Sequence, residues 1–204
     1  PTIGPSRSSG ELYGGIELSD EGVKAIALQV SQGGEEAGLR LVHSEIIRLR
    51  LGRTSYGEFP PQASTDAAKV VSTAYMRLRQ QYRVSPERIY FIASSRLRAD
   101  HPPDLGAAIR KTTGLTLTFL DPVTEVQLSI AGTIPRTGKV GATSIDNRNT
   151  SVLIHIGAAG TQGGYEMLKY SQPDSPSFDF VVMNIPQGLV SYANEISRAV
   201  GPGS

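Results

Sequence analysis

Two stretches of this chain follow one pattern, and this repetition limits its fold more than any other feature. Residues 14–24 and 153–164 each read as an apolar strand, a turn of small or polar residues, and a second strand. Such turns can point backbone N–H groups into a concavity, and two that face each other across a cleft can hold the phosphates of a nucleotide or polyphosphate. That chemistry needs small residues for close approach and a carboxylate for a metal ion. The small residues are largely present, but the strand ends carry Glu17 and His155.

The first two thirds of the chain has the predicted order β-β-β-α-β-α-β-α. Alternating apolar residues, turn residues and helix caps support this order. After a first strand that begins near Glu11, the predicted strands are 23–30, 39–51, 87–93 and 115–120, and the predicted helices are 64–83, 104–113 and 121–132. Ser64 or Thr65 is expected to cap the first helix. This α/β order is ribonuclease-H-like: helices cover a mixed sheet, and ligands lie at the carboxyl ends of its strands.

The order then begins to repeat and stops after β-β-β-α. The predicted domains are a flexible arm (1–10), a complete first lobe (11–134), a connection (135–150), a partial second lobe (151–200) and a tail (201–204). The partial lobe favours an excised fragment over a natural mini-lobe.

Composition excludes several classes of protein. The chain has 20 basic and 19 acidic side chains, so no long-range field marks it as a general binder of DNA or of membranes. It has no cysteine, which excludes disulfides and thiolate metal sites. No apolar run approaches the roughly 20 residues of a membrane-spanning helix, and we expect no leader before the first strand. A cytoplasmic location is expected.

Five segments resemble the exopolyphosphatase and guanosine pentaphosphate phosphatase (Ppx/GppA) family, whose members have the actin-like ATPase fold. Residues 15–24 resemble its first phosphate loop, I-D-x-G-S-N-S, and residues 92–98 resemble its A-T-S-A-x-R segment. Residues 114–132 resemble its T-G-L … E-E-A-R-L-x-x-x-G segment. Residues 154–162 are similar to its second loop, D-I-G-G-G-S-T-E, and residues 185–188 to the following L-P-L-G. The first hairpin alone also resembles the pilus-assembly actin-like proteins.

The resemblance implies hydrolysis of a terminal phosphoanhydride by water, with Mg²⁺ neutralising the phosphates. Glu125 would position or deprotonate the water, and Arg98 would stabilise phosphate charge. The implied phosphate-binding residues are Ser19, Ser94, Ser95, Gly157, Gly160 and Thr161. Glu125 also fits a plain first-turn acid, Arg98 a solvated arginine, and the Thr161 hydroxyl a group that closes a turn.

Both loops depart from the family pattern. Asp20 and Glu21 put negative charge where phosphate oxygens would lie, and repulsion between close like charges can reach several kcal/mol at an effective dielectric of about 20. Glu17 and His155 occupy the two aspartate positions, and Gln162 occupies that of the last glutamate. An imidazole and a neutral amide are poor ligands for Mg²⁺. Ala158 and Ala159 replace two glycines of the second loop, which narrows the approach of a phosphate to the backbone.

These observations favour a diverged Ppx/GppA-like module that has lost phosphohydrolase activity or keeps it weakly, with a role in binding, assembly or regulation. The alternative is an active exopolyphosphatase or guanosine pentaphosphate phosphatase that uses Glu125 and Arg98. The expected ligand is polyphosphate or a guanine nucleotide, and the expected partner is another protein or a second copy of the chain.

Overall fold

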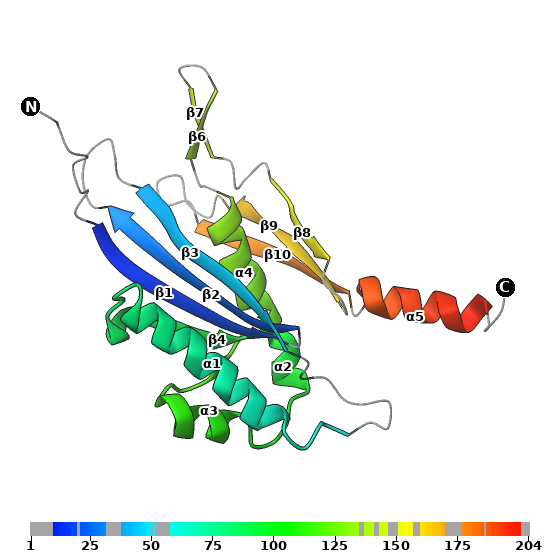
Figure 1. The fold of residues 1–204 in the computed structure, drawn as a ribbon. Helices are drawn as coiled ribbons and strands as arrows, with labels where there is room; N and C mark the ends of the chain where they lie inside the picture. The colour runs from blue at the N-terminus through cyan, green and yellow to red at the C-terminus, as the bar shows by residue number, and fades with distance from the viewer. Residues whose placement is uncertain are drawn as a thin grey trace, which may run out of the picture. The chain divides into compact units, whose positions relative to one another are not determined.

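The chain forms two compact units, residues 1–120 and residues 121–204 (Figure 1). The computed structural model describes residues 10–19, 21–31, 38–49, 51, 58–134, 137–140, 143–146, 151–156, 160–169, 177–185 and 187–200. The expected arm at 1–9 and the tail at 201–204 lie outside the described residues, as do Asp20, Gly157, Ala158 and Ala159.

A five-stranded sheet with the strand order β3-β2-β1-β4-β5 forms the centre of the first unit. Its strands are β1 (Gly10–Ser19), β2 (Gly22–Ser31), β3 (Gly38–Arg48), β4 (Ile89–Ala93) and β5 (Thr118–Phe119). The first three strands form the predicted antiparallel meander, and β4 lies parallel to β1. The carboxyl ends of β1 and β4 therefore meet at one edge of the sheet, as the ribonuclease-H-like order predicts.

Helices cover one face of this sheet. They are α1 (Ala63–Gln80), α2 (Ser95–Ala99) and α3 (Leu105–Thr113), with a short 3₁₀ turn, η2 (Pro86–Arg88), before β4. The predicted apolar stripe of α1 is confirmed, because Ala67, Val71, Ala74 and Leu78 are buried in one core with Ile16 and Leu18 of β1. Gly114 ends α3 in the left-handed conformation, at φ 75°.

The start of α1 differs from the prediction. Gln62 occupies the N-cap position, and Ser64 lies inside the helix, where it is buried. Its hydroxyl donates to Asp104 Oδ1 at 2.5 Å and so ties α1 to the residue that precedes α3. A hydroxyl that has a long-range partner is not available to cap its own helix. The strand expected at 115–120 is also shorter, and the five-residue helix α2 was not predicted.

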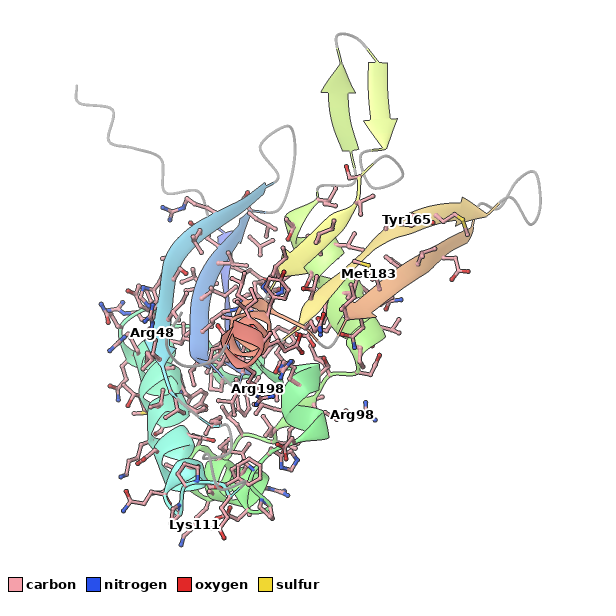
Figure 2. All side chains as sticks on the ribbon, turned by 90° about the vertical axis from the view of Figure 1, so that its right-hand side faces the viewer. Arg48, Arg98, Lys111, Tyr165, Met183 and Arg198 are labelled. Carbon is pink, nitrogen blue, oxygen red and sulfur yellow. The ribbon has the colours of Figure 1, made fainter. Side chains whose placement is uncertain are left out.

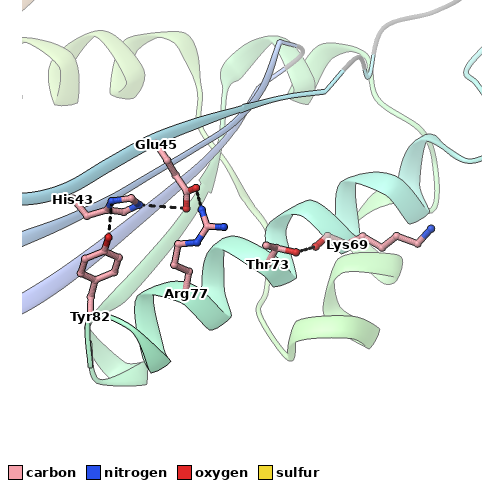
Figure 3. A network of polar contacts seen from close by, with 6 residues as sticks. All are labelled: His43, Glu45, Lys69, Thr73, Arg77 and Tyr82. Atoms are coloured by element: carbon pink, nitrogen blue, oxygen red, sulfur yellow. Dashed lines mark hydrogen bonds and ion pairs between the residues drawn. The ribbon is translucent and has the colours of Figure 1, made fainter.

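A polar network joins β3 to the C-terminal half of α1 (Figure 3). His43 stacks on Tyr82, and the Tyr82 hydroxyl lies 2.9 Å from His43 Nδ1. His43 Nε2 lies 3.4 Å from a carboxylate oxygen of Glu45, whose other oxygen pairs with the Arg77 guanidinium. Because His43 and Glu45 face the helix from β3, this network holds the outer strand of the meander against α1.

The second unit consists of a helix, a hairpin, a three-stranded sheet and a final helix. The elements are α4 (Pro122–Thr133), β6 (Thr137–Val140), β7 (Thr143–Asp146), β8 (Leu153–Ile156), β9 (Thr161–Lys169), β10 (Ser177–Ile185) and α5 (Leu189–Val200). The sheet order is β10-β9-β8, and all pairs are antiparallel. The repeated β-β-β-α order predicted for the end of the chain is therefore present.

Helix α4 packs on the second sheet through Gly164. A Cβ atom at Gly164 would lie 2.3 Å from Val181 O and 3.1 Å from Val126 Cγ1, so the missing side chain lets the helix approach the strands. The structure thus places α4 with the second unit, whereas the expected boundary followed it, near residue 134. Residues 137–146, expected to be a plain connection, contain the hairpin β6–β7. Within the described residues, no helix is long and apolar enough to span a membrane.

Candidate functional site

The turn between β1 and β2 is held by its own polar groups. Ser19 pairs with Gly22 across the turn. The Ser19 hydroxyl donates to Gly22 O at 3.2 Å and accepts from Glu21 N–H at 3.3 Å. Gly22 has a φ of 147°, and a Cβ atom there would lie 2.2 Å from Ile47 O, so glycine is required. The Ser19 hydroxyl, for which a phosphate contact was predicted, is bonded within the turn in this structure.

Glu17 has a basic partner in the same hairpin. It lies opposite Lys24 in the register of β1 and β2, and Lys24 Nζ is 3.5 Å from Glu17 Oε2. The two side chains are partly exposed, so the pair is worth at most about 1 kcal/mol, but it neutralises the carboxylate. Sequence analysis missed Lys24 as this partner. The signal was available, because a two-residue turn places residues 17 and 24 opposite each other.

The segment after β4 brings three of the predicted residues to the same edge of the sheet. Leu18 pairs with Ala93 in the parallel register, and Ser94 N–H donates to Leu18 O at 2.9 Å. Ser19, the last residue of β1, and Ser94, the first residue after β4, therefore lie at the ends of two neighbouring strands. Ser94 and Ser95 are buried, and the Ser94 hydroxyl has no hydrogen-bond partner among the described residues.

Arg98 lies one turn after Ser94, and its N–H donates to Ser94 O at 3.3 Å. The side chain is exposed at the surface of α2, as its label in Figure 2 shows. The Ser94 hydroxyl, without a partner among the described residues, and the exposed Arg98 guanidinium can each donate to an anion. The segment from β4 to α2 is therefore the part of the predicted site that keeps polar groups available.

Glu125 lies in the first turn of α4, in the second unit, and is half-buried. Asp121 caps this helix: it accepts from Thr124 N–H at 2.9 Å and from the Thr124 hydroxyl at 2.6 Å. Two hydrogen bonds from Thr124 hold the pKa of the Asp121 carboxyl below its usual value. The bond from the Thr124 hydroxyl has the larger effect, and the bond from the Thr124 backbone N–H the smaller. Asp121 thus fixes the start of the helix that carries Glu125. Arg98, its expected catalytic partner, belongs to the first unit.

In the second loop, two of the predicted residues face each other across strands. His155 of β8 lies opposite Gln162 of β9. The Thr161 hydroxyl donates to Gln187 O at 2.8 Å and so connects β9 to the start of α5. This long-range contact does not close a turn, so it bears on neither of the two alternatives for Thr161, a phosphate contact or a turn-closing bond. Gly160 directly precedes β9, and Gly157 lies outside the described residues.

These residues do not fit a magnesium ion. His155 supplies an imidazole and Gln162 a neutral amide, whereas Mg²⁺ favours carboxylate oxygens. Glu17 pairs with Lys24. Among the residues that the structure describes, no three His, Asp or Glu side chains gather as a metal-binding group. Within the described part of both hairpins, no set of donors matches the Mg²⁺ implied by the resemblance.

Comparison with solved structures identifies the fold. A Ppx/GppA family member from Aquifex aeolicus superposes with a TM-score of 0.61 at 14% identity, and the match covers 90% of this chain and 54% of that one. An exopolyphosphatase from Cytophaga hutchinsonii gives 0.62 at 12% identity, with 91% and 53% covered. A nucleoside triphosphate hydrolase from Neospora caninum gives 0.50 at 8% identity, with 88% and 45% covered.

The ribonuclease-H-like, actin-like ATPase fold predicted from the sequence is therefore confirmed, and the resemblance to Ppx/GppA proteins holds at the level of fold. The chain spans about half the length of these structures. No protein-family profile matches the chain, and no curated protein does.

Proposed function

We propose that this chain is a diverged Ppx/GppA-like module that has lost efficient phosphohydrolase activity and serves binding, assembly or regulation. One observation carries the proposal. The fold is kept, but the polar groups expected to hold phosphate and metal in the first hairpin are used in contacts within the protein. Ser19 closes its turn, and Glu17 pairs with Lys24.

This arrangement weakens phosphate binding for a physical reason. An anion at the first turn would have to displace the Ser19 hydroxyl from Gly22 O and approach the carboxylate of Glu21. In the second loop, the Thr161 hydroxyl is bonded to Gln187 O, and His155 and Gln162 offer no carboxylate for a bridging metal. A hydrolase of this kind must bind both the phosphate and a metal ion.

The second candidate is an active exopolyphosphatase or guanosine pentaphosphate phosphatase. The buried Ser94 hydroxyl, without a partner among the described residues, and the exposed Arg98 favour it, because both can donate to a phosphate oxygen. In this function, Glu125 orients or deprotonates the attacking water, and the whole-protein activity includes residues outside this chain. The ligand would be polyphosphate or a guanine nucleotide, and we propose a cytoplasmic location without DNA as a partner.

Phosphate release separates the two candidates. The chain is incubated with long-chain polyphosphate, guanosine pentaphosphate and GTP, with and without Mg²⁺. We expect release at background level, unchanged by Glu125→Gln. Glu58, an exposed glutamate that precedes α1, provides the control. Release that Glu125→Gln abolishes, while Glu58→Gln leaves it intact, would overturn the proposal in favour of the active enzyme.

Thermal unfolding with the same compounds measures binding without turnover. Binding that remains should depend on Ser94 and Arg98, so Ser94→Ala and Arg98→Ala should remove the stabilisation. Ser19→Ala and Arg110→Ala are the matched controls, because Ser19 is used in its turn and Arg110 is an exposed arginine of α3. Stabilisation lost in Ser19→Ala alone, after correction for its own unfolding temperature, would refute this assignment of donors.

A further inference from the structure

Lys24 places a cation near the edge of the first sheet at which β1 and β4 end. It is the third residue of β2, and Glu17 of β1 lies opposite it in the antiparallel register. Glu17 lies in turn opposite Ile92 of β4 in the parallel register. Paired residues of neighbouring strands have their side chains on one face of a sheet. Lys24, Glu17 and Ile92 therefore form a row across one face.

Ser94 lies on this face as well. Its N–H donates to Leu18 O at 2.9 Å, which extends the pairing of β1 and β4 one residue past Ala93. Its backbone is extended, at φ −59° and ψ 155°, and two residues along an extended chain return the side chain to the same face. Ser94 is 5% exposed, and its hydroxyl has no hydrogen-bond partner among the described residues. An ammonium and a buried hydroxyl thus belong to the same face.

The spacing of the two groups suits an anion with more than one phosphate. Lys24 and Ser94 are separated by two strand spacings across the sheet and by two residues along it, which is about 12 Å between Cα atoms. The long, flexible lysine side chain shortens this gap, and its ammonium has three donors. One oligophosphate can therefore contact the ammonium and the hydroxyl together, whereas a single phosphate contacts one of them.

Glu17 lies between these two groups in the row and is bound to the first of them. Lys24 Nζ is 3.5 Å from Glu17 Oε2, and the two side chains are 46% and 33% exposed. A pair that is long and partly exposed is weak. A phosphate group carries nearly two negative charges near pH 7, whereas the carboxylate carries one. The carboxylate thus occupies the lysine as a weak internal anion, and a stronger anion can replace it.

We propose that the contact between Glu17 and Lys24 is autoinhibitory, and that Lys24 and Ser94 bind an oligophosphate without a metal ion once Glu17 is displaced. The proposal rests on the loss of the metal site proposed above, because an ammonium then supplies the positive charge that a phosphate chain needs. It adds regulation to that function. The affinity of the first unit for phosphate is set by one carboxylate of the protein itself.

The test is to remove that carboxylate. The ¹⁵N-labelled chain is titrated with sodium triphosphate in EDTA at constant ionic strength, and binding is followed by NMR. Glu17→Gln should bind triphosphate about tenfold more tightly than the unsubstituted chain, because one negative charge about 5 Å from the anion is gone. The amide signals that move should include those of Lys24 and Ser94.

Glu11→Gln is the matched control. Glu11 is on the same face of β1, is also paired with a cation, Arg88, and changes the net charge by the same amount. It is six residues from Glu17, about 20 Å along the strand, which is beyond the screening length of about 8–10 Å. Glu11→Gln should therefore leave the affinity unchanged.

A second substitution in Glu17→Gln identifies the cation. Lys24→Gln should abolish the gain in affinity, and Lys24→Arg should keep it. Lys69→Gln should keep it too, because Lys69 is on α1, where it pairs with Asp66. Far-UV circular dichroism confirms that each variant is folded.

Three results would overturn the proposal: no gain in Glu17→Gln, an equal gain in Glu11→Gln, or a gain that persists in Glu17→Gln with Lys24→Gln. The second would mean that net charge alone controls binding, and the third that another cation holds the triphosphate. None of them restores hydrolysis, so the proposed loss of phosphohydrolase activity would stand. Conversely, phosphate release that depends on Glu125 would refute that loss, while this titration without metal would still report on Glu17 and Lys24.

Discussion

Placing carboxylates in the second hairpin is the most direct test of whether His155 and Gln162 keep it from binding a metal ion. His155 and Gln162 lie opposite each other on β8 and β9. The double variant His155→Asp, Gln162→Glu places two carboxylates across one pair of strands, where Cβ atoms are about 5 Å apart. If the rest of the hairpin still has the geometry of a metal loop, this change should create a weak site for Mg²⁺.

The expected magnitudes follow from the geometry. Two carboxylates about 5–6 Å apart at a partly exposed position repel by about 1 kcal/mol. For a unit of this size, 1 kcal/mol lowers the unfolding temperature by roughly 4–8 °C. A site with a dissociation constant of about 1 mM recovers about 1.4 kcal/mol in 10 mM Mg²⁺, because the ion binds only the folded state.

The assay is thermal unfolding followed by circular dichroism, with and without MgCl₂, in NaCl adjusted to equal ionic strength. The salt control is needed because screening alone also reduces the repulsion. The single variants His155→Asp and Gln162→Glu carry one new carboxylate each and should show neither the full loss nor the Mg²⁺-specific recovery. The reasoning is refuted if NaCl and MgCl₂ rescue the double variant equally, or if its unfolding temperature does not fall.

Three further perturbations test the framework that positions the candidate site. Arg77→Leu removes the guanidinium that pairs with the largely buried Glu45 and should lower the free energy of unfolding by about 2 kcal/mol. The loss should be smaller than the roughly 3–5 kcal/mol of a fully buried pair because Arg77 is partly exposed. In chemical denaturation, the double variant with Glu45→Leu should recover most of this loss. Asp121→Asn should destabilise α4 above pH 4 and lose its effect at lower pH. The depressed pKa of Asp121 contributes stability that is present above the unfolded pKa and lost as pH falls through the folded value. Unfolding free energies of the unsubstituted chain and of Asp121→Asn that differ by the same amount from neutral pH down to pH 2 would contradict this prediction. Arg83→Gly should stabilise the first unit by up to about 1 kcal/mol in urea unfolding, because Arg83 holds a φ of 57° that glycine adopts without strain, and Arg83→Ala should give no such gain.

Local signals in the sequence predicted most of the first unit. The meander of β1 to β3 and the apolar stripe of α1 follow from alternation and helical spacing, and Gly114 ends α3 where the pattern places it. The predictions failed where contacts between residues far apart in the chain determine the local structure. Ser64 looked like a cap but bonds to Asp104, which is 40 positions away in the chain. Helix α2 has only five residues, too few for a periodic pattern.

The second unit was predicted less completely because its packing is less local. The hairpin β6–β7 lies in a polar stretch that contains glycines, and such a stretch is typical of a connection. Helix α4 follows the last strand of the first lobe in sequence, yet it packs on β9 through Gly164. Nothing in the spacing of α4 shows which sheet it will cover, since a helix with one apolar face fits either.

In the candidate site, too, contacts between neighbours in the hairpin were predictable from the sequence, and contacts between distant residues were not. The partner of Glu17 was readable, because a two-residue turn sets the pairing with Lys24. The bond from Thr161 to Gln187 was not, because it joins residues 26 positions apart. The positions of Ser94, Ser95 and Arg98 at the end of β4 agree with the predicted segment, but their catalytic and phosphate-binding roles remain proposals.

A loop that binds phosphate must keep donors available in the absence of its ligand, and available donors cost stability. In the first hairpin, Ser19 and Glu17 bond within the protein, so this turn is stable without a ligand and gains little from one. Of the candidate phosphate-binding side chains, the Ser94 hydroxyl is the one that is buried and has no partner among the described residues, so it is a donor that is not bonded within the protein. A fold that has given up ligand binding should lose such costly groups first at the positions where internal partners are nearest. The first hairpin satisfies that condition and the end of β4 does not, which is why the proposal names Ser94 and Arg98 as the donors to test for anion binding in this unit.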